Sequence, residues 1–331
     1  MQLSKHFAIA TLASAISLPV HAQTSEYALR FYGSGVGPPG QQDRVLLPLD
    51  DDLPGPAGHT PVDIGSGGFT LEWWMRGRLS DNDSDSNGGD VERFDYSWIN
   101  AHIIFDRDVW CGTERSYGVS IAGGLVQFGN SSGDAPDFDS ANTIEGSTSV
   151  LDDQWHHVAV VRDAATGTKH IYVDGVLDFS SSAGVSFADL SYPDDGVPVT
   201  GNCGTGQLTP YGRFLVFAAE KHDAGAAYPS YAGYIDEVRL WATARSARQI
   251  ADNYDQVVAP GSPGLVGYYR FEEGSGTVLG DSSDAGSPDA QLIAGIAGNG
   301  EWVSRAADPD NTAPLAASTD RIFSSGFEPP P

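Results

Sequence analysis

Short stretches of alternating hydrophobic and polar residues run along most of this chain of 331 residues, and the clearest lies at residues 154–179. Residues 155–162 and 169–173 are rich in Val, Ile, Tyr, Trp and His, which favour a pleated, half-buried strand. A polar connection containing Gly167 separates them, and Asp174-Gly175 then favours a two-residue turn with positive φ at both positions. The pattern predicts a three-stranded meander, which needs a second sheet to cover it.

The same kind of pattern predicts further strands, at residues 27–33, 43–47, 69–76, 99–105, 117–122, 125–128, 211–219 and 233–241. Residues 246–254 predict one short helix with Ser246 as N-cap. The segment 264–277 predicts a strand that returns to the sandwich and is a candidate partner for the first strand. The fold class is therefore all-β, an antiparallel two-sheet sandwich with one short helix after its closing strand. We expect Trp74, Trp155 and Trp241 to be core residues between the sheets.

The two ends of the chain differ from this pattern. Residues 1–22 combine Lys5, an apolar run and a small-residue site at Ala22, which is typical of a cleaved signal peptide. No other stretch is long and apolar enough for a membrane span, so we expect a secreted, cell-surface or periplasmic protein. The domain then covers residues 26–305, and residues 306–331 are expected to form a flexible tail.

The predicted export would place the two cysteines, Cys111 and Cys203, in an oxidising compartment. In an oxidising compartment an even count favours a disulfide, and two free thiols are the alternative. The net charge of −26 repels nucleic acid and anionic membranes and favours cations, although a solvated surface without a partner has the same composition.

Two groups of motifs resemble a known family. They are WHHVA at 155–159 with YVDG at 172–175, and GYIDEVRLW at 233–241. Both are similar to signature segments of LamG-like jellyroll domains, within the concanavalin A-like lectin and glucanase superfamily, over residues 26–305. The resemblance implies a jellyroll that recognises glycans or extracellular protein surfaces without catalysis. Tyr32 stands where the family usually has Asp, so a cation role at that position is not carried over.

Hydrolases of this superfamily would need a pair of carboxylates about 5 Å apart, carried by a Glu-x-Asp-x-Glu strand. The chain has no such motif. Asp236 and Glu237 are adjacent, which in a regular strand sends them to opposite faces, and we expect them to pair with Arg239 or backbone amides. His156 and His157 are likewise expected to be packed or hydrogen-bonded. A hydrolase with a non-standard acid pair and a purely structural adhesion protein remain the alternatives.

One acidic loop has the spacing of a calcium-binding loop. Its candidate ligands are Asp81, Asp83, Asp85, Asn87 and Glu92, although Ser86 stands where an EF-hand has Gly. A disordered acidic insertion is the alternative. The jellyroll of the pentraxins implies a second, weaker Ca²⁺ candidate at Glu220 and Asp223.

Overall fold

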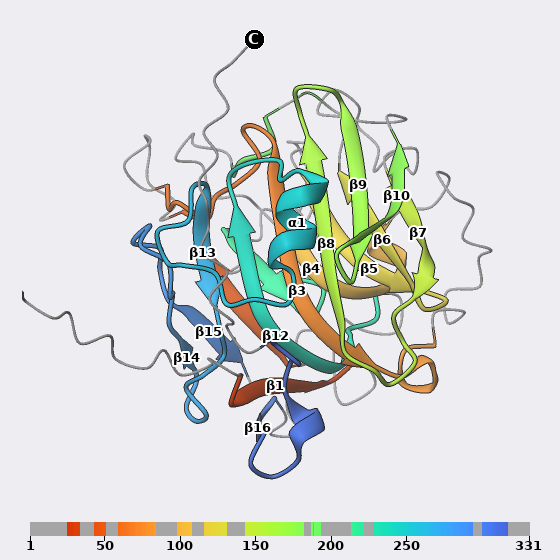
Figure 1. Ribbon diagram of the computed structural model, residues 1–331, viewed down its shortest axis with the longest axis vertical. Coiled ribbons are helices and arrows are strands. Elements are labelled where there is room, and N and C mark those ends of the chain that lie inside the picture. Colours follow the sequence, from red (N-terminus) through yellow and green to blue (C-terminus); the bar gives the residue numbers. More distant parts are fainter. Residues whose placement is uncertain are drawn as a thin grey trace, which may run out of the picture.

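The computed structural model describes residues 25–33, 43–50, 59–83, 98–107, 116–130, 143–181, 187, 189–192, 213–221, 228–293 and 300–316. These residues form two antiparallel sheets of eight strands each, packed face to face (Figure 1). The predicted all-β jellyroll sandwich is confirmed. Within these ranges, no helix has the length and apolar character that crossing a membrane requires.

Sheet A has the strand order β10-β9-β8-β3-β12-β1-β16, and β13 joins the edge of β12 that also carries β1. Its strands are β1 (Tyr27–Tyr32), β3 (Phe69–Gly77), β8 (His156–Asp163), β9 (Thr168–Val173), β10 (Val176–Ser181), β12 (Ala232–Trp241), β13 (Leu265–Tyr269) and β16 (Glu301–Ser304). The predicted meander is present as β8, β9 and β10, and its Asp174 and Gly175 have φ of 50° and 77°. The expected pairing of the segment 264–277 with the first strand is wrong, because β13 pairs with β12 while β1 pairs with β12 and β16.

Sheet B has the order β14-β15-β2-β11-β4-β5-β6-β7. Its strands are β2 (Arg44–Pro48), β4 (His102–Arg107), β5 (Tyr117–Ala122), β6 (Leu125–Asn130), β7 (Thr143–Ser149), β11 (Phe214–Phe217), β14 (Val278–Leu279) and β15 (Ala290–Ile293). Chain neighbours β4 to β7 pair in sequence, whereas β2 and β11 meet from distant parts of the chain. Sheet B therefore needs strands from both the N-terminal and the C-terminal halves of the domain.

The main core lies between the sheets, and β3 shows how alternation fills it. Phe69, Leu71, Trp73 and Met75 are fully buried and point towards sheet B, where the Trp73 ring packs edge-on against Phe105 at 4.9 Å between centroids. Their neighbours along the strand point to the opposite, outer face of sheet A.

The expectation that Trp74, Trp155 and Trp241 fill the space between the sheets is wrong. Trp74 and Trp241 are buried, but both lie in small apolar clusters apart from the main core, and Trp155 is only half-buried beside Trp74. The alternation that places Trp73 inside places Trp74 outside. The three indoles therefore anchor segments that cover the outer face of sheet A.

Two such segments cross this face. The helix α1 (Ala247–Asn253) lies over sheet A in Figure 1. Ser246 caps it, as predicted, and Gln249 completes a capping box. The second is residues 306–316, here called the C-terminal strap. Ala313 is fully buried and Leu315 is 7% exposed, both against Trp74. The predicted tail boundary is thus too early, since residues 306–316 pack on the fold, while the rest of the predicted tail, residues 317–331, lies outside the described residues.

Candidate functional site

The predicted calcium loop is described only at its start. Asp81 ends a 3-10 turn, Leu79–Asp81, with its carboxylate exposed and bonded to Ser80 Oγ at 3.1 Å. The main-chain carbonyl of Asp83 accepts a hydrogen bond from His102 Nε2 at 3.1 Å. The other candidates, Asp85, Asn87 and Glu92, lie outside the described residues. Among the residues that are described, no group of three or more His, Cys, Asp or Glu could hold a metal ion, so calcium binding stays a prediction.

The second cation candidate and the cysteines are also tested only in part. Glu220 follows β11 and is 1% exposed, which places its side chain inside the protein. Asp223, Cys111 and Cys203 lie outside the described residues, so the disulfide stays a prediction.

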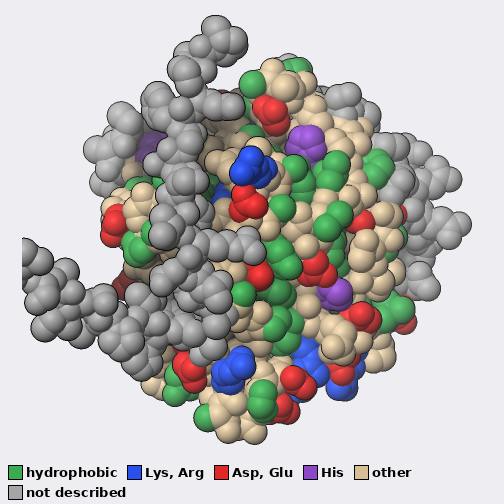
Figure 2. All heavy atoms as spheres, viewed as in Figure 1, with side chains coloured by type: hydrophobic (Ala, Val, Ile, Leu, Met, Phe, Trp, Pro, Cys, Tyr) green, Lys and Arg blue, Asp and Glu red, His purple; other side chains and the backbone are tan. Residues whose placement is uncertain are grey.

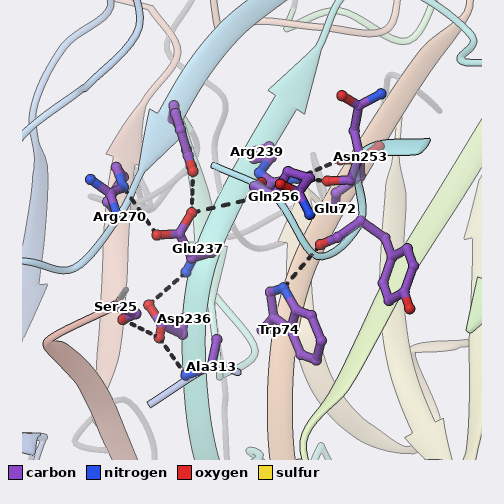
Figure 3. A network of polar contacts seen from close by, with 12 residues as sticks. Ser25, Glu72, Trp74, Asp236, Glu237, Arg239, Asn253, Gln256, Arg270 and Ala313 are labelled. Atoms are coloured by element: carbon purple, nitrogen blue, oxygen red, sulfur yellow. Dashed lines mark hydrogen bonds and ion pairs between the residues drawn. The ribbon is translucent and has the colours of Figure 1, made fainter. Parts of the chain in front are cut away.

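Buried carboxylates on the outer face of sheet A are held by arginines (Figure 3). Glu72 of β3 accepts a short hydrogen bond from Arg245 and a longer one, 3.5 Å, from Arg239 Nη1. Arg239 also donates to the main-chain carbonyls of Asn253 at 3.1 Å and Gln256 at 2.6 Å. Glu72 is fully buried, and the two arginines balance its charge inside the protein. Because the same arginines also bond main-chain carbonyls of α1, the cluster links the helix to the sheet.

The second and third carboxylates, Asp236 and Glu237, lie on the same face. The expectation of opposite faces is wrong, because a β-bulge shifts the register between Asp236 and Arg239 and Glu237 has φ of 52°. Asp236 Oδ2 lies 2.7 Å from Ser25 Oγ and accepts the Ala313 amide at 2.9 Å (Figure 3). Burial, and then the charge of Glu237, raise the pKa of Asp236 well above its usual value.

Glu237 is satisfied by residues of β12, of β13 and of the segment directly after β13. It accepts hydrogen bonds from the Tyr268 hydroxyl and, at 3.0 Å, from Arg270 Nε, and it lies 3.6 Å from Arg239 Nη2. The expected structural pairing of both acids is confirmed. Asp236 is 0% and Glu237 1% exposed, so neither carboxylate is presented to a substrate at the surface.

The adjacent histidines are both packed or hydrogen-bonded, as expected. His156 bridges two carboxylates, with Nδ1 2.8 Å from Asp174 and Nε2 3.1 Å from Asp152. The hydrogen bond to Asp174 raises its pKa, followed by the smaller contribution of Asp152. His157 is buried edge-on against Trp74, and burial lowers its pKa well below the usual value. His157 is therefore neutral at neutral pH.

An open cavity of about 340 Å³ lies on the outer face of sheet A, and the buried acids Glu72, Asp236 and Glu237 are not among its lining residues. We call it the arginine–tyrosine pocket, after its lining side chains Arg30, Tyr32, Arg76, Arg78, Asp81, Asp153 and Tyr234. Strand register explains how it forms, since Arg30 of β1 lies opposite Tyr234 of β12, which lies opposite Arg76 of β3. Figure 2 shows basic and acidic side chains together at the lower end of this face, near β1, β3 and β12 of Figure 1.

Two of the three arginines share one acid. Arg76 Nε and Arg78 Nη2 donate to the two oxygens of Asp153 at 3.0 and 2.9 Å. The hydrogen bond from Arg78 does most to hold the pKa of Asp153 below its usual value. Arg76 also donates to the Asp310 carbonyl of the C-terminal strap at 2.7 Å, and Trp155 Nε1 donates to the same carbonyl at 2.8 Å. The strap therefore fixes one wall of the pocket.

Arg30 is held differently, by aromatic rings. Its guanidinium carbon lies 4.7 Å from the ring centroid of Tyr32 and 5.5 Å from that of Tyr234. Among the described residues it has no ion pair, although Glu301 of β16 lies opposite it in register. Glu301 instead hydrogen-bonds Tyr32, and together with burial, the larger cause, this raises the pKa of Tyr32 to about 12. Stacking orients Arg30 and leaves its N–H edge for a ligand.

Sequence reasoning missed this pocket, except for Asp81, which it assigned to calcium. The remaining lining residues come from β1, β3, β12 and the turn before β8, and no short motif joins them. The available signal was the alternation within each strand, which places Arg30, Arg76 and Tyr234 on the outer face.

Comparison with known proteins agrees with the fold. The family model described as the concanavalin A-like lectin/glucanases superfamily matches residues 57–194, which confirms the resemblance to this superfamily over that part of the chain. No curated protein matches the chain.

The solved structures to which the chain is similar include the following three. One, from Bacteroides ovatus ATCC 8483, is provisionally described as a carbohydrate-binding protein; it is 17% identical, with a TM-score of 0.49, and 89% of this chain covers 65% of that one. The SAP-like pentraxin of Limulus polyphemus is 12% identical, with a TM-score of 0.41, over 82% of this chain and 96% of that one. The Ruminococcus gnavus IT-sialidase CBM40 is 11% identical, with a TM-score of 0.39, over 71% and 99%. The chain thus spans about two thirds of the Bacteroides ovatus protein.

Proposed function

We propose that this chain, whose residues 57–194 match the concanavalin A-like lectin/glucanases superfamily, is a non-catalytic module that recognises glycans outside the cytoplasm. One observation carries the proposal: the three buried carboxylates of sheet A do not line the open pocket, and Asp153, which does line it beside Asp81, is bonded to Arg76 and Arg78. The acids Glu72, Asp236 and Glu237 are at most 1% exposed, whereas the arginine–tyrosine pocket is open and lined by polar and aromatic groups. Polar groups converging in a concave site favour binding of a small ligand or a sugar.

The rival hydrolase needs two carboxylates that reach the glycosidic bond. Asp236 and Glu237 share a face, which the sequence did not predict. The C-terminal strap, Arg239 and Arg270, the residue after β13, enclose them. Their arrangement supports a structural role, since each oxygen already has a partner that a substrate would have to displace.

The test is binding and hydrolysis measured on the same glycans. Protein lacking residues 1–22 is applied to a glycan array, and the glycans it retains are incubated with it and assayed for new reducing ends. We expect retention without cleavage. New reducing ends that disappear in Glu237→Gln would establish the hydrolase instead, and an empty array together with a protein ligand would favour the adhesion alternative.

Assistance by Ca²⁺ and export are further parts of the proposal. Calcium binding rests on Asp81, Asp83 and Asp85, and calorimetric titration of the protein with Ca²⁺ before and after all three are changed to Asn tests it. A silent thermogram for the unchanged protein would remove calcium from the account. Export predicts that the secreted protein begins at Gln23, which N-terminal sequencing checks.

A further inference from the structure

The arginine–tyrosine pocket is a local exception to the charge of the protein. The chain has a net charge of −26 and only 18 Lys and Arg residues, yet three arginines line this one cavity beside two aspartates. At physiological salt, interactions between exposed charges are screened beyond roughly 8 Å, so the charge of the lining counts more than the distant acids. The five charged lining residues therefore sum to one positive charge, and Glu301, which lies opposite Arg30 in register, stands outside the lining.

The excess positive charge belongs to Arg30. Asp153 bonds both Arg76 and Arg78, and Arg76 is further held by the Asp310 carbonyl. Arg30 is half-buried between the rings of Tyr32 and Tyr234 without an ion pair in the described part of the chain. A guanidinium fixed by stacking loses little side-chain entropy when it binds, and its planar edge matches the two oxygens of a carboxylate.

The same contacts disfavour a neutral sugar stacked on the tyrosines. Arg30 packs on Tyr32 and Tyr234, while Arg76, 5.6 Å from the Tyr234 centroid, and Trp155, 6.1 Å from it, surround that ring further. The rings act as supports for guanidinium groups rather than as free platforms.

We propose that the arginine–tyrosine pocket binds the carboxylate of an acidic sugar, with Arg30 as its main partner and Arg78 as a second donor at the rim. This rests on the proposed function and names the class of glycan. Arg78 contributes because its side chain is 59% exposed and Asp153 occupies only part of its donor fork. Arg76 instead positions Asp153 and the C-terminal strap, so the carboxylate of the sugar is bound by Arg30 and Arg78.

The test compares acidic sugars with their neutral counterparts. The probes are oligogalacturonate, a glucuronate-containing oligosaccharide and sialyllactose, each beside its methyl-esterified form, titrated calorimetrically into protein lacking residues 1–22. The variants are Arg30→Gln, which keeps a polar side chain, and Arg30→Lys, which keeps the charge and loses the planar fork. Arg248→Gln is the matched control, because Arg248 lies on α1 with its side chain 91% exposed and outside the pocket.

We expect at least one acidic probe to bind and its ester to bind much more weakly. Arg30→Gln should weaken binding about 10- to 100-fold, the loss typical of a hydrogen-bonded charge pair, and Arg30→Lys should weaken it less. Arg248→Gln should bind like the unchanged protein, and thermal melting of all variants confirms that they fold. If both Arg30 variants have a lowered melting temperature, the difference in affinity between acid and ester for the unchanged protein still tests the inference.

Four outcomes overturn the inference. Equal binding of acid and ester, or unchanged affinity in a folded Arg30→Gln, removes the carboxylate site and leaves glycan recognition standing. Binding to neutral glycans alone does the same. Failure to bind any acidic or neutral glycan removes both this inference and the proposed function.

Discussion

Replacing Glu72 by alanine tests the buried charge network that joins α1 to sheet A. Glu72 is fully buried and pairs with Arg239, 0% exposed, and Arg245, 7% exposed. Without the carboxylate, Arg245 keeps the Gln249 carbonyl at 3.0 Å as an acceptor, but neither guanidinium keeps this counter-charge. Breaking a buried ion pair from one side costs roughly 3–5 kcal/mol, so we expect a loss of that size in the free energy of unfolding.

Urea unfolding followed by tryptophan fluorescence measures this loss. Asp252→Ala is the matched control, since Asp252 pairs with Arg248 at 3.4 Å on the exposed side of α1 and should cost below about 1 kcal/mol. Adding Arg245→Met to Glu72→Ala should recover part of the loss, because it removes one of the stranded charges. The reasoning is refuted if Glu72→Ala costs no more than Asp252→Ala.

Three further predictions concern other parts of the fold. Gly118→Ala should cost about 1–3 kcal/mol in urea unfolding, because the new Cβ would lie 2.2 Å from the Trp98 ring, and an unchanged midpoint would show that this ring can move aside. His156→Gln should lower stability most below pH 6.5, because the pKa of His156 is raised in the folded protein and the stability this contributes is lost as pH rises through that pKa. Urea unfolding at pH 5.5 and at pH 8.5 checks this. A larger loss of stability at pH 8.5 than at pH 5.5 would contradict it. Truncation after Arg305 should lower the melting temperature and expose indole fluorescence to quencher, unlike truncation after residue 316, whereas equal melting of both would mean that the C-terminal strap adds nothing.

Most of the strand framework followed from the sequence, because half-buried strands and their turns leave local patterns. Asp174-Gly175 and Ser246 both acted as their residue types require, the first with positive φ and the second as a cap. The four strands that the pattern missed, β7, β14, β15 and β16, are short or polar, with Thr143–Ser149 exposing its last three residues. Local alternation is too weak there to predict a strand.

The errors on the outer face of sheet A have physical causes. Trp73 and Trp74 are equally apolar, and only their parity with Leu71 and Met75 shows which indole faces sheet B. The β-bulge at Glu237, which has a left-handed backbone conformation, shifts the alternation so that Glu237 faces the same side as Asp236. The amino-acid sequence of a strand does not reveal such a bulge. The C-terminal strap has no hydrophobic periodicity in its sequence. It is held by individual contacts with distant residues, such as the hydrogen bond from the Ala313 amide to Asp236.

The candidate pocket depends on register between strands more than 40 residues apart along the chain. Arg30, Tyr234 and Arg76 become neighbours only because β12 lies between β1 and β3. Sequence reasoning identified the class of fold, and the resemblance led to the class of ligand that we propose, but the candidate site was placed in the acidic loop that begins at Asp81. That residue lines the rim of the pocket, so the two candidate sites adjoin each other.

A crystal structure of the protein with the acidic oligosaccharide that binds most tightly among the three probes tests the central claim most directly. The account predicts a carboxylate in the arginine–tyrosine pocket, with both oxygens about 2.7–3.2 Å from guanidinium nitrogens of Arg30. A carboxylate bound elsewhere, with Arg30 still stacked between its tyrosines and touching no ligand, would contradict it.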